Sequence, residues 1–463
     1  MGSALCVIVG RTLVSARPTP YPPPLPEDLL EGLGHTVLVP RRRGAPYTQR
    51  RIVAALGLAL VLVGSGVGVS RLVAVVGGEG DVAAAETTGA GAGETSDLPS
   101  STSSTTVPTS TEGSGPTPAE EWAAALPSAL TTMDLRERIT GDISPKSVVA
   151  SGHGLVSAQN MMYTHTVTFY EGDGSLAATM ADSVDLADFG IDGHPGTSQG
   201  APVEAAFTAD GRHAYISNYS MYGTGFGPEG SDSCTPDSGV DESFVYRVDT
   251  TTFAIDQVIA VGAVPKYVAV TPDGATVLVT NWCTWDLSVI DVATATEVAR
   301  VPIGRYPRGI AVAPDSRTAY VAVMGGSEVM TVDLASRSSS LLATVGEGPR
   351  HLVLSPDGAT LYVTSNDAGT VSAIDTASGV VEATVSTGSE PRSMAISPDG
   401  TALYIVEYES SQVVKLRADD LTQLAVVATD LHPIGIAYEA TTGSVWVACY
   451  GGSIMVFDDR TPA

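Results

Sequence analysis

Short apolar runs bounded by turn residues recur along the C-terminal part of the chain. The clearest copy extends from Pro349 to Val385, where β-branched segments alternate with turns at Pro356-Asp357-Gly358 and at Gly379. This pattern predicts four short strands joined by three turns, which form one small antiparallel sheet. A single sheet of this size cannot bury both of its faces, so we expect it to be one unit of a repeat.

The aspartate of the turn recurs every 42 residues, at Asp273, Asp315, Asp357 and Asp399. Weaker copies at Val148 to Gly154, at Asp210 and at Ile434 to Asp458 bring the number of units to seven. A period of this length with four strand-like segments is typical of a β-propeller. Because Asp210 lies 63 residues before Asp273, we expect an insertion of about 21 residues in the second unit, at Gly223 to Glu242.

The last unit lacks a fourth strand, because only a few residues follow Asp458. The segment from Arg136 to Asp142 reads as a strand, and the residues after it, up to Ser147, match the join between later units around Pro391. We therefore expect this early strand to complete the seventh blade and to close the ring, which removes the free sheet edges.

The repeats also carry the signature of a known family. Tyr362 to Asn366 reads Tyr-Val-Thr-Ser-Asn, Val279 to Asn281 reads Val-Thr-Asn, and the third strands end in Ile-Asp at Asp291 and Asp375. In these features residues 135–459 resemble the YVTN-repeat family of YncE-like seven-bladed β-propellers. The resemblance implies an all-β fold for residues 131–463. It leaves the function open, because the family is a scaffold with varied ligands and one fold hosts many functions.

The chain before the repeats divides into three parts. Residues 1–51 are rich in Pro and Arg and predict a disordered tail. Residues 52–76 begin with 19 uncharged residues, Ile52 to Ser70, which span about 28 Å as a helix and predict a single transmembrane helix. Residues 77–130 are Gly, Ala, Ser, Thr and Pro and predict a disordered stalk.

Basic residues precede the apolar run, at Arg41, Arg42, Arg43, Arg50 and Arg51, whereas acidic residues dominate after it. The positive-inside rule then predicts a single-pass protein of the cell membrane, with a cytoplasmic N-terminus and an extracellular propeller. The alternative is a signal peptide cleaved near Ala83-Ala84-Ala85. Mature protein that begins near Glu86 would favour this alternative.

The charge of the chain narrows the classes of partner. The sequence has 24 basic and 51 acidic residues, of which 8 and 3 lie up to Arg71, so 16 basic and 48 acidic residues follow, a net charge of −32. Such a charge repels phosphate backbones, so we expect no nucleic-acid partner. We expect a monomer whose partner is an envelope glycan, peptide or protein.

In a propeller, the loops between second and third strands share one face with the loops that join consecutive blades, and loops of this kind carry binding residues. Alignment of the units places there Gln159, Asn160, Tyr163, His165, Asn218, Tyr219, Tyr222, Asn281, Trp282, Trp285, Glu407 and Tyr450. Aromatic rings and amides on one rim suit a carbohydrate or peptide ligand through stacking and hydrogen bonds. The alternative is that these side chains cap the interfaces between blades.

A second set of residues begins the innermost strands. Five of the blades have a basic residue after Pro, namely Lys146, Lys266, Arg308, Arg350 and Arg392, while Glu204 and Ile434 take this place in the other two. The five cations are candidates for a ring that binds a carboxylate or a phosphate. The alternative is that each one bridges adjacent blades by bonding loop carbonyls or the repeated aspartate.

The insertion contains Cys234, which should project from blade 2 on the same rim as Cys283 of blade 3. Outside the cytoplasm we expect these cysteines to form a disulfide. The acidic residues of the insertion do not have the spacing of an EF-hand, and the Met and His residues show no repeated spacing. We therefore expect neither a metal site nor a cofactor.

Catalytic signatures are weak. The sequence has no Gly-x-Ser-x-Gly elbow and no His-Glu-x-x-His motif. The sequence therefore favours a ligand- or protein-binding module at the cell envelope. The alternative is a lactonase- or lyase-like enzyme that uses rim residues, with candidates at His165, His351, His432, Arg350 and Glu407.

Overall fold

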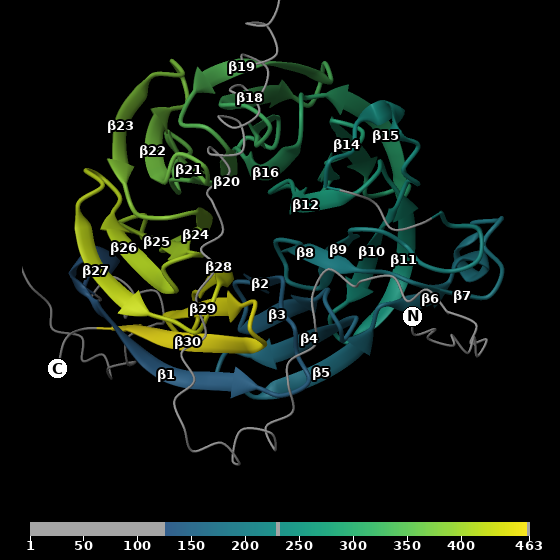
Figure 1. The fold of residues 1–463 in the computed structure, drawn as a ribbon, viewed down its shortest axis with the longest axis horizontal. Helices are drawn as coiled ribbons and strands as arrows, with labels where there is room; N and C mark the ends of the chain where they lie inside the picture. The colour runs from purple at the N-terminus through teal and green to yellow at the C-terminus, as the bar shows by residue number, and fades with distance from the viewer. Residues whose placement is uncertain (1–125, 228–231, 461–463) are drawn as a thin grey trace, which may run out of the picture. The chain divides into compact units, whose positions relative to one another are not determined.

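The structure, a computed structural model, describes residues 126–227 and 232–460. These residues form seven four-stranded antiparallel sheets arranged around a central axis (Figure 1), which confirms the predicted seven-bladed propeller. The predicted tail at 1–51, the transmembrane helix at 52–76 and most of the stalk lie outside the described residues. Within the part of the chain that is described, no helix is long and apolar enough to cross a membrane.

Each blade contributes one strand to each of four concentric layers. The innermost strands are β2 (Ser147–Ala150), β8 (Pro202–Phe207), β12 (Pro265–Val270), β16 (Pro307–Val312), β20 (Pro349–Leu354), β24 (Pro391–Ile396) and β28 (Pro433–Glu439). The second strands are β3 (Leu155–Asn160), β9 (His213–Asn218), β13 (Thr276–Asn281), β17 (Thr318–Val323), β21 (Thr360–Ser365), β25 (Ala402–Glu407) and β29 (Ser444–Cys449). The third strands are β4 (Thr166–Glu171), β10 (Phe244–Asp249), β14 (Asp286–Asp291), β18 (Glu328–Asp333), β22 (Thr370–Asp375), β26 (Gln412–Arg417) and β30 (Ser453–Arg460). The outer strands are β5 (Leu176–Ala181), β11 (Ala254–Ala260), β15 (Thr296–Pro302), β19 (Ser338–Thr344), β23 (Val381–Ser386), β27 (Gln423–Ala428) and β1 (Thr132–Thr140).

Burial follows the layers. The second strands are buried on both faces, as in β13, where five consecutive residues are buried, because they lie between neighbouring blades. The outer strands alternate between half-buried and exposed positions, as β23 does from end to end, because one of their faces meets water. Blade interfaces therefore form the core: Tyr320 of blade 4 packs with Leu352 and Val363 of blade 5.

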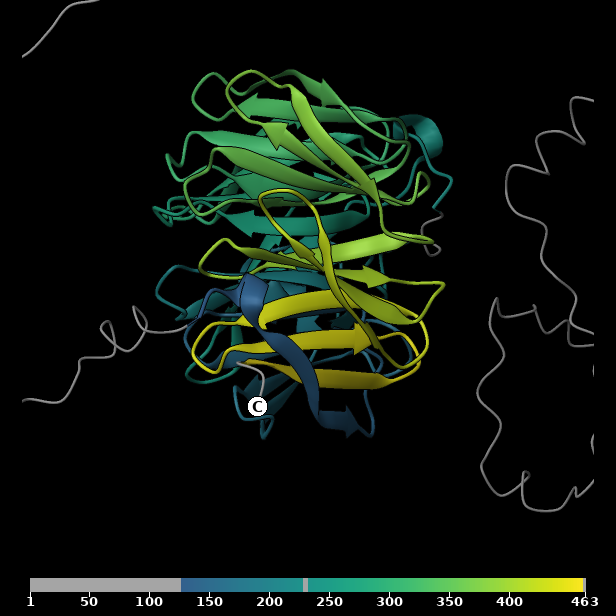
Figure 2. The ribbon, with the colours of Figure 1, turned by 90° about the vertical axis from the view of Figure 1, so that its left-hand side faces the viewer.

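Strand β1 closes the ring. It pairs antiparallel with β30, from Thr132 opposite Arg460 to Thr140 opposite Ser453, and Figure 2 shows the blue strand beside the yellow one. Innermost strand β28 of this last blade also lies beside β2 of the first. The predicted closure by the segment before the first unit is thus confirmed, with a strand that starts earlier than Arg136.

A buried network fixes this closure. Lys415 of β26 donates from Nζ to Asp459 of β30 at 2.6 Å and to the Thr131 hydroxyl at 2.9 Å. The Tyr404 hydroxyl donates to the other oxygen of Asp459 at 2.5 Å. The side chains of Lys415 and Asp459 are fully buried. Blade 6, blade 7 and the start of β1 are therefore joined by one network in which each charge has a partner.

The repeated aspartate shapes a turn on the far face of the blades. Asp273 accepts hydrogen bonds from the Thr271 hydroxyl at 2.6 Å and from the Ala275 amide at 3.0 Å. Gly274 follows with φ +70°, a conformation that glycine adopts without steric cost. These hydrogen bonds lower the pKa of Asp273. The aspartate that recurs every 42 residues therefore stabilises a turn and is not a binding residue.

Two segments depart from the repeat. The loop between β9 and β10 is the predicted insertion, and it contains the 3₁₀ helix η4 (Pro236–Ser238). A second insertion, which the sequence did not predict, lies between blades 1 and 2: the hairpin of β6 (Ser183–Asp185) and β7 (Thr197–Gln199), with η3 (Leu186–Phe189) between its strands. A third 3₁₀ helix, η2 (Ser128–Leu130), precedes β1 and donates from the Ser128 amide to Asp399 at 2.7 Å.

Candidate functional site

The loops between second and third strands and the loops between blades meet on one face, which we call the rim. In six of the seven blades, the first residue after the second strand donates its amide to a carbonyl of the preceding interblade loop. Examples are Trp282 to Val264 at 3.0 Å, Met324 to Tyr306 at 3.0 Å and Tyr450 to His432 at 2.9 Å. The repeat therefore places one side chain per blade next to the loop that begins the innermost strand.

Five residues predicted for the rim lie inside the blades, fully buried: Gln159, Asn160, Asn218, Asn281 and Glu407. Their polar groups mostly hold the rim loops. Asn160 accepts from the Ser144 amide at 3.1 Å, and Asn281 donates to Asp286 at 2.7 Å. Glu407 differs, because neither of its carboxylate oxygens has a hydrogen-bond partner among the described residues and burial raises its pKa. These side chains position the rim and do not face an incoming ligand.

The predicted aromatic residues divide between packing and exposure. Tyr219 and Trp282 are buried beneath the insertion, where Trp282 stacks on Tyr306 with ring centroids 4.4 Å apart. Trp285 meets the same Tyr306 edge-on at 6.2 Å. Tyr163 is 64% exposed. The aromatic side chains therefore form a packed cluster around Tyr306, and Tyr163 is exposed separately. They do not form one continuous aromatic surface.

His165 and Tyr222 lie together at blades 1 and 2, with ring centroids 6.0 Å apart. His165 Nδ1 lies 3.3 Å from Asp182 Oδ2 and 3.0 Å from the Gly200 carbonyl. Asp182 is fully buried, and this burial raises its pKa. The other histidines proposed for catalysis are elsewhere: His432 stacks on Tyr408 at 4.6 Å, and His351 lies in the channel.

The five predicted cations, Lys146, Lys266, Arg308, Arg350 and Arg392, start the innermost strands and form what we call the cation ring. Their charges act on one another: Lys266, Arg308, Arg350 and Arg392 all lower the pKa of Lys146, after burial as the largest cause. The same two causes lower the pKa of Arg350 well below its usual value. The structure therefore brings these five side chains into one electrostatic site at the mouth of the central channel.

The register corrects one member of the predicted set. In blade 3, Pro265 pairs with Asn281 and Tyr267 pairs with Thr280. Blade 2 has the equivalent register, in which Pro202 pairs with Asn218 and Glu204 pairs with Ser217. Val203 is thus the counterpart of Lys266, and Glu204 is the counterpart of Tyr267. The prediction placed Glu204 at the ring position, which is one residue out of register, because Val203 leaves no charge to mark that position in blade 2.

Two members of the cation ring have acidic partners. Lys266 Nζ lies 3.1 Å from Asp232 of the insertion, and Arg392 lies 2.6 Å from Glu390 of its own loop. For Lys146, Arg308 and Arg350 the described residues provide no salt bridge, and the ion pairs present do not involve the repeated turn aspartate. Of the two ion pairs, only that of Lys266 with Asp232 joins neighbouring blades, since Glu390 belongs to the same loop as Arg392.

Rim side chains pack against the cation ring. Lys266 lies 4.2 Å from the Tyr219 ring centre, Lys146 lies 5.2 Å from that of Tyr450, and Arg392 lies 3.9 Å from that of Tyr408. Arg350 instead meets the sulfur of Met324 at 3.8 Å. Cation–π contacts attract the charges without neutralising them. Tyr219 and Tyr450 of the predicted aromatic set thus lie beside the cation ring.

Burial and mutual repulsion disfavour the charged form of the ring. Burial followed by the charge of Arg392 lowers the pKa of Arg308 to about 10. Burial lowers the pKa of Lys266 to about 8, although Asp232 opposes this shift. Arg350 is only 5% exposed, and its Nε atom has no hydrogen-bond partner among the described residues. An anion at the mouth would offset this repulsion.

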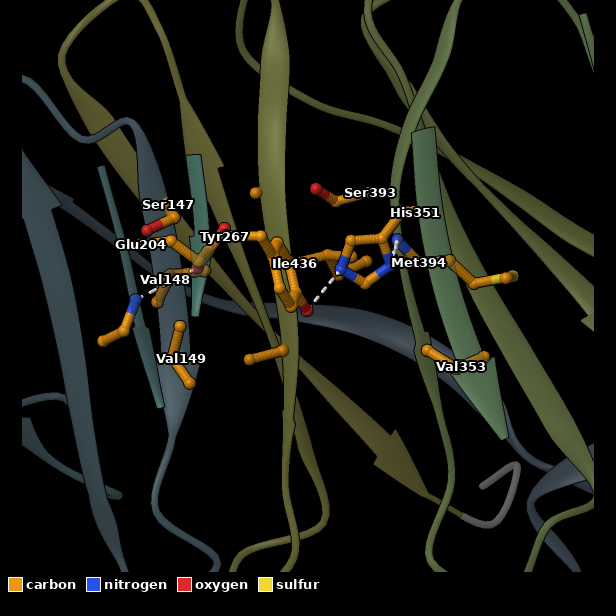
Figure 3. Close-up of a pocket in the computed structure, with 13 residues that line it drawn as sticks. Ser147, Val148, Val149, Glu204, Tyr267, His351, Val353, Ser393, Met394 and Ile436 are labelled. Atoms are coloured by element: carbon orange, nitrogen blue, oxygen red, sulfur yellow. Dashed lines mark hydrogen bonds between the residues drawn. The ribbon is translucent and has the colours of Figure 1, made fainter. Parts of the chain in front are cut away.

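A cavity of about 180 Å³ lies in the channel directly below the cation ring. Its polar lining consists of the side chains that follow the ring positions, Ser147, Glu204, Tyr267, His351 and Ser393, and Figure 3 shows Ser147 beside Glu204 and Tyr267 directed at His351. Val149, Val353 and Ile436 line the apolar remainder. The channel therefore changes from cationic at the mouth to polar and then apolar.

Hydrogen bonds fix the protonation of His351. Its Nδ1 accepts from the Met394 amide at 3.3 Å, and its Nε2 lies 2.9 Å from the Tyr267 hydroxyl (Figure 3). Burial, Arg350 and Arg308 lower the pKa of His351 to about 3, so the ring is neutral and carries its proton on Nε2. Nε2 then donates to the Tyr267 oxygen. The Tyr267 hydrogen is left to donate into the cavity.

Glu204 is the carboxylate of this cavity. Burial raises its pKa to about 7, although the Ser147 hydroxyl and the charges of Arg308 and Arg350 act in the opposite direction. The Glu204 carboxylate accepts a long hydrogen bond, of 3.4 Å, from the backbone amide of Ala205. Its negative charge also raises the pKa of Tyr267. Glu204 is thus a titratable acceptor within the field of the cation ring.

The predicted disulfide between Cys234 and Cys283 is present, and its Cα atoms lie 5.2 Å apart. It ties the insertion to blade 3 two residues after Asp232, whose backbone carbonyl accepts from Trp282 Nε1 at 3.0 Å. The disulfide therefore fixes the carboxylate that neutralises Lys266. Among described residues, no group of three or more His, Cys, Asp or Glu side chains is placed to hold a metal ion.

Sequence reasoning missed Tyr267, Ser147 and Ser393 as a second layer of the site. The sequence contained the information, because each of these residues directly follows a ring position. In a regular strand only alternate residues face the channel, so the residue after a ring position is expected to point away from it. What obscured it was the bulge that lets two successive residues, such as Arg350 and His351, both reach the channel.

Comparisons with known proteins agree with this architecture. Residues 238–418 match the model of the family described as YNCE-like beta-propeller. A search of curated protein sequences gives no match. Among solved structures, the chain is similar to Kuenenia stuttgartiensis hydrazine synthase, with 21% identity, 69% of this chain and 96% of that chain covered, and a TM-score of 0.54.

The chain is also similar to a structure of the mitotic checkpoint complex, with 12% identity, 71% of this chain and 92% of that chain covered, and a TM-score of 0.56. At these identities the likeness concerns the fold alone. The family match over residues 238–418 and the seven blades of the described residues confirm the predicted resemblance to YncE-like seven-bladed β-propellers.

Proposed function

We propose that the protein is a binding module that captures a small anionic ligand at the mouth of its central channel. The observation that carries this proposal is the set Lys146, Arg308 and Arg350, which converge at the mouth and form no salt bridge among the described residues. Taking charges out of water is costly unless a partner compensates. A carboxylate or phosphate group provides that compensation, and arginine suits both through paired hydrogen bonds.

The ligand is a small anion or an acidic group on a larger molecule, and not a nucleic acid. Five clustered cations create a local positive field, but the surrounding chain is strongly acidic and repels a long polyanion. An acidic group of an envelope glycan, peptide or protein reaches the mouth with only its head group, so it avoids most of this repulsion.

Calorimetric titration with inorganic phosphate tests the proposal. We expect saturable binding to the wild type and a loss of about 10-fold or more in affinity for Arg350→Ala, because one charge-assisted contact contributes roughly 1.5–3 kcal/mol. Arg305→Ala is the matched control, since Arg305 is an exposed rim cation that lies over the Tyr306 ring. Equal binding by wild type and Arg350→Ala would refute the site.

Our proposal for the cellular setting is an extracellular propeller, anchored to the cell membrane by residues 52–76 with residues 1–51 in the cytoplasm. The apolar run and its flanking arginines support the anchor, and a disulfide is typical of an oxidising compartment. Fractionation of cells, with protease added outside, should release the propeller and leave the N-terminal tail protected. A mature N-terminus near Glu86 would replace the anchor with a cleaved signal peptide.

A second candidate function is a lactonase- or lyase-like activity at the rim. The observation that favours it is His165, whose Nδ1 lies 3.3 Å from the fully buried Asp182, an arrangement that orients a histidine as a general base. Hydrolysis of a panel of lactones that is abolished by His165→Ala and reduced by Asp182→Asn would support an enzyme. Identical low rates in both variants and the wild type would exclude this site.

A further inference from the structure

The cavity below the cation ring has the chemistry of a second subsite. It offers a carboxylate acceptor at Glu204 and a hydroxyl donor at Tyr267. The hydroxyls of Ser147 and Ser393 also line the cavity, and they already donate to Gln159 and to the Ile434 carbonyl. Polar groups that line a cavity and have few internal partners need partners from a ligand or from water. A molecule held by the cation ring would extend its uncharged part into this lining.

The position of the cavity makes it continuous with the mouth. Ser147 follows Lys146, His351 follows Arg350 and Ser393 follows Arg392, so these three cavity residues lie one step along the chain from a cation, whereas Glu204 follows Val203. The charges of Arg308 and Arg350 also act directly on Glu204. A head group at Arg308 and Arg350 therefore lies within electrostatic range of Glu204.

The size of the cavity limits what enters it. Its volume of about 180 Å³ is below the roughly 300–1,000 Å³ of pockets that enclose drug-sized ligands. A tail of about three carbons fits this description better than a polymer does. The apolar residues Val149 and Val353 contact the carbon skeleton of such a tail.

The donors and acceptors indicate the chemistry of the tail. A hydroxyl group can donate to Glu204 and accept from Tyr267, so a tail with two hydroxyl groups satisfies both. The direction of the Tyr267 donor is fixed, because neutral His351 donates from Nε2 to the Tyr267 oxygen at 2.9 Å. An ammonium tail would pair with Glu204 but would face five cations, which disfavours it.

We propose that the ligand is a small anion with a hydroxylated tail, whose anionic head is bound by Arg308, Arg350 and Lys146 and whose hydroxyl groups are bound by Glu204 and Tyr267 in the channel cavity. This inference rests on the proposed anion-binding function. It adds a class of ligand to it, namely polyol phosphates or hydroxy acids with a short carbon chain.

The test compares ligands that share a head and differ in the tail. Glycerol phosphate and propyl phosphate carry the same head and the same number of carbons, and only the first has hydroxyl groups. We expect glycerol phosphate to bind the wild type about 10-fold more tightly than propyl phosphate, in calorimetric titration at one pH. Glycerate compared with propionate repeats the test for a carboxylate head, and the tighter pair identifies the preferred head.

Variants of the cavity residues test whether the difference in affinity between the two phosphates arises in the cavity. In Glu204→Gln and in Tyr267→Phe the ratio between the two phosphates should fall to about 3 or below, because charge-assisted or direct hydrogen bonds to the hydroxyls are weakened. Arg350→Ala is the matched control: it should weaken both ligands equally and leave the ratio unchanged. Melting curves of each variant establish that the fold is intact.

The outcomes separate this inference from the proposed function. Failure of inorganic phosphate and of both organic phosphates to bind would refute the anion site and the subsite together. Equal affinity for glycerol phosphate and propyl phosphate, with Arg350→Ala weakening both, would refute the subsite and leave the anion site standing. Tighter binding of 3-aminopropyl phosphate than of glycerol phosphate would also overturn the subsite, since the cavity would then select a cation.

Discussion

Lysine and arginine side chains are buried or half-buried in two parts of the described propeller, and the two parts differ in how the charge is satisfied. Lys415 in blade 6 is fully buried, and it bonds Asp459 at 2.6 Å and Thr131 at 2.9 and 3.2 Å. In the cation ring, Lys146, Arg308 and Arg350 lie among like charges with no salt bridge in the described residues. In the Lys415 cluster the buried charge has its partners within the chain. In the cation ring, three charges have no salt bridge among the described residues.

The difference separates a structural role from a binding role. The Lys415 network connects blades 6 and 7 to the closing strand, so its charges serve the ring itself. The cation ring offers positive charge that the described chain does not neutralise, which is unfavourable for stability unless a ligand completes it. Residues in functional sites commonly reduce stability in this way. Substitutions in the structural part of the propeller and in the cation ring should therefore have different effects.

The largest effect is expected for Lys415→Met. Removal of one partner from a fully buried pair leaves Asp459 uncompensated, which costs about 3–5 kcal/mol in the free energy of unfolding. Chemical denaturation measures this cost. The double variant Lys415→Met/Asp459→Asn should recover part of the loss, since it no longer buries a lone charge. A single variant as stable as the wild type would contradict the structural role of this network.

A smaller loss is expected when the disulfide is removed in Cys234→Ser/Cys283→Ser. The two cysteines are 49 residues apart in sequence, and closure of a loop of this length contributes about 2–4 kcal/mol. The variant also frees Asp232, so Lys266 should lose its partner and become available to anions. Denaturation gives the stability, and titration with phosphate should show equal or tighter binding. Weaker phosphate binding would indicate that the insertion helps to form the site.

In the cation ring, Arg350→Met should change stability by no more than about 1 kcal/mol, and in the stabilising direction, because it relieves repulsion without breaking a salt bridge. The same substitution should lower phosphate affinity about 10-fold. The opposite signs of these two effects distinguish a binding cation from a structural one. A loss of several kcal/mol, similar to Lys415→Met, would remove the distinction.

The smallest effect concerns pH. The pKa of Glu204 is raised from 4.5 to about 7 by burial. Its contribution to folding stability is therefore fully present below about pH 4.5 and is lost as pH rises through about 7. Ionised Glu204 also opposes anions, so sulfate, which keeps its charge in this range, should bind roughly 3- to 10-fold more weakly at pH 8 than at pH 6.

Glu204→Gln is the control for this pH effect. The variant should lose most of the decrease in sulfate affinity between pH 6 and pH 8, and the decrease that remains near pH 8 comes from Lys266, whose pKa burial lowers to about 8. His351 does not titrate in this interval, because its pKa is lowered to about 3. A pH dependence that persists unchanged in Glu204→Gln would assign the effect to other groups.

The fold was predictable because the repeat records it in the sequence. The interval between turn aspartates such as Asp315 and Asp357 defined the blades, and the missing strand of the last unit identified β1 as its partner. The hairpin of β6 and β7 was not predicted, since it lies in the stretch between the two weakest repeats. An element that departs from a repeat leaves no periodic signal.

The site was predictable only in part. The cations were found because they occupy one repeat position, and the Cys234–Cys283 disulfide was found because its loops are adjacent. The burial of Gln159 and Asn281 was not predicted, because chain alignment gives the position of a residue and not the direction of its side chain. Glu204 was assigned one residue out of register, because Val203 stands where five other units have a basic residue after Pro and no charge marks the ring position.

The central claim, that the three unpartnered cations bind an anion, is tested most directly by crystals of the propeller soaked in selenate. Selenium scatters anomalously, so the position of the anion is observed without assumptions about its neighbours. We predict one strong anomalous peak at the channel mouth, within hydrogen-bond distance of Arg308 and Arg350, which disappears in Arg308→Ala/Arg350→Ala. Peaks only elsewhere, or the same peak in the double variant, would contradict the account.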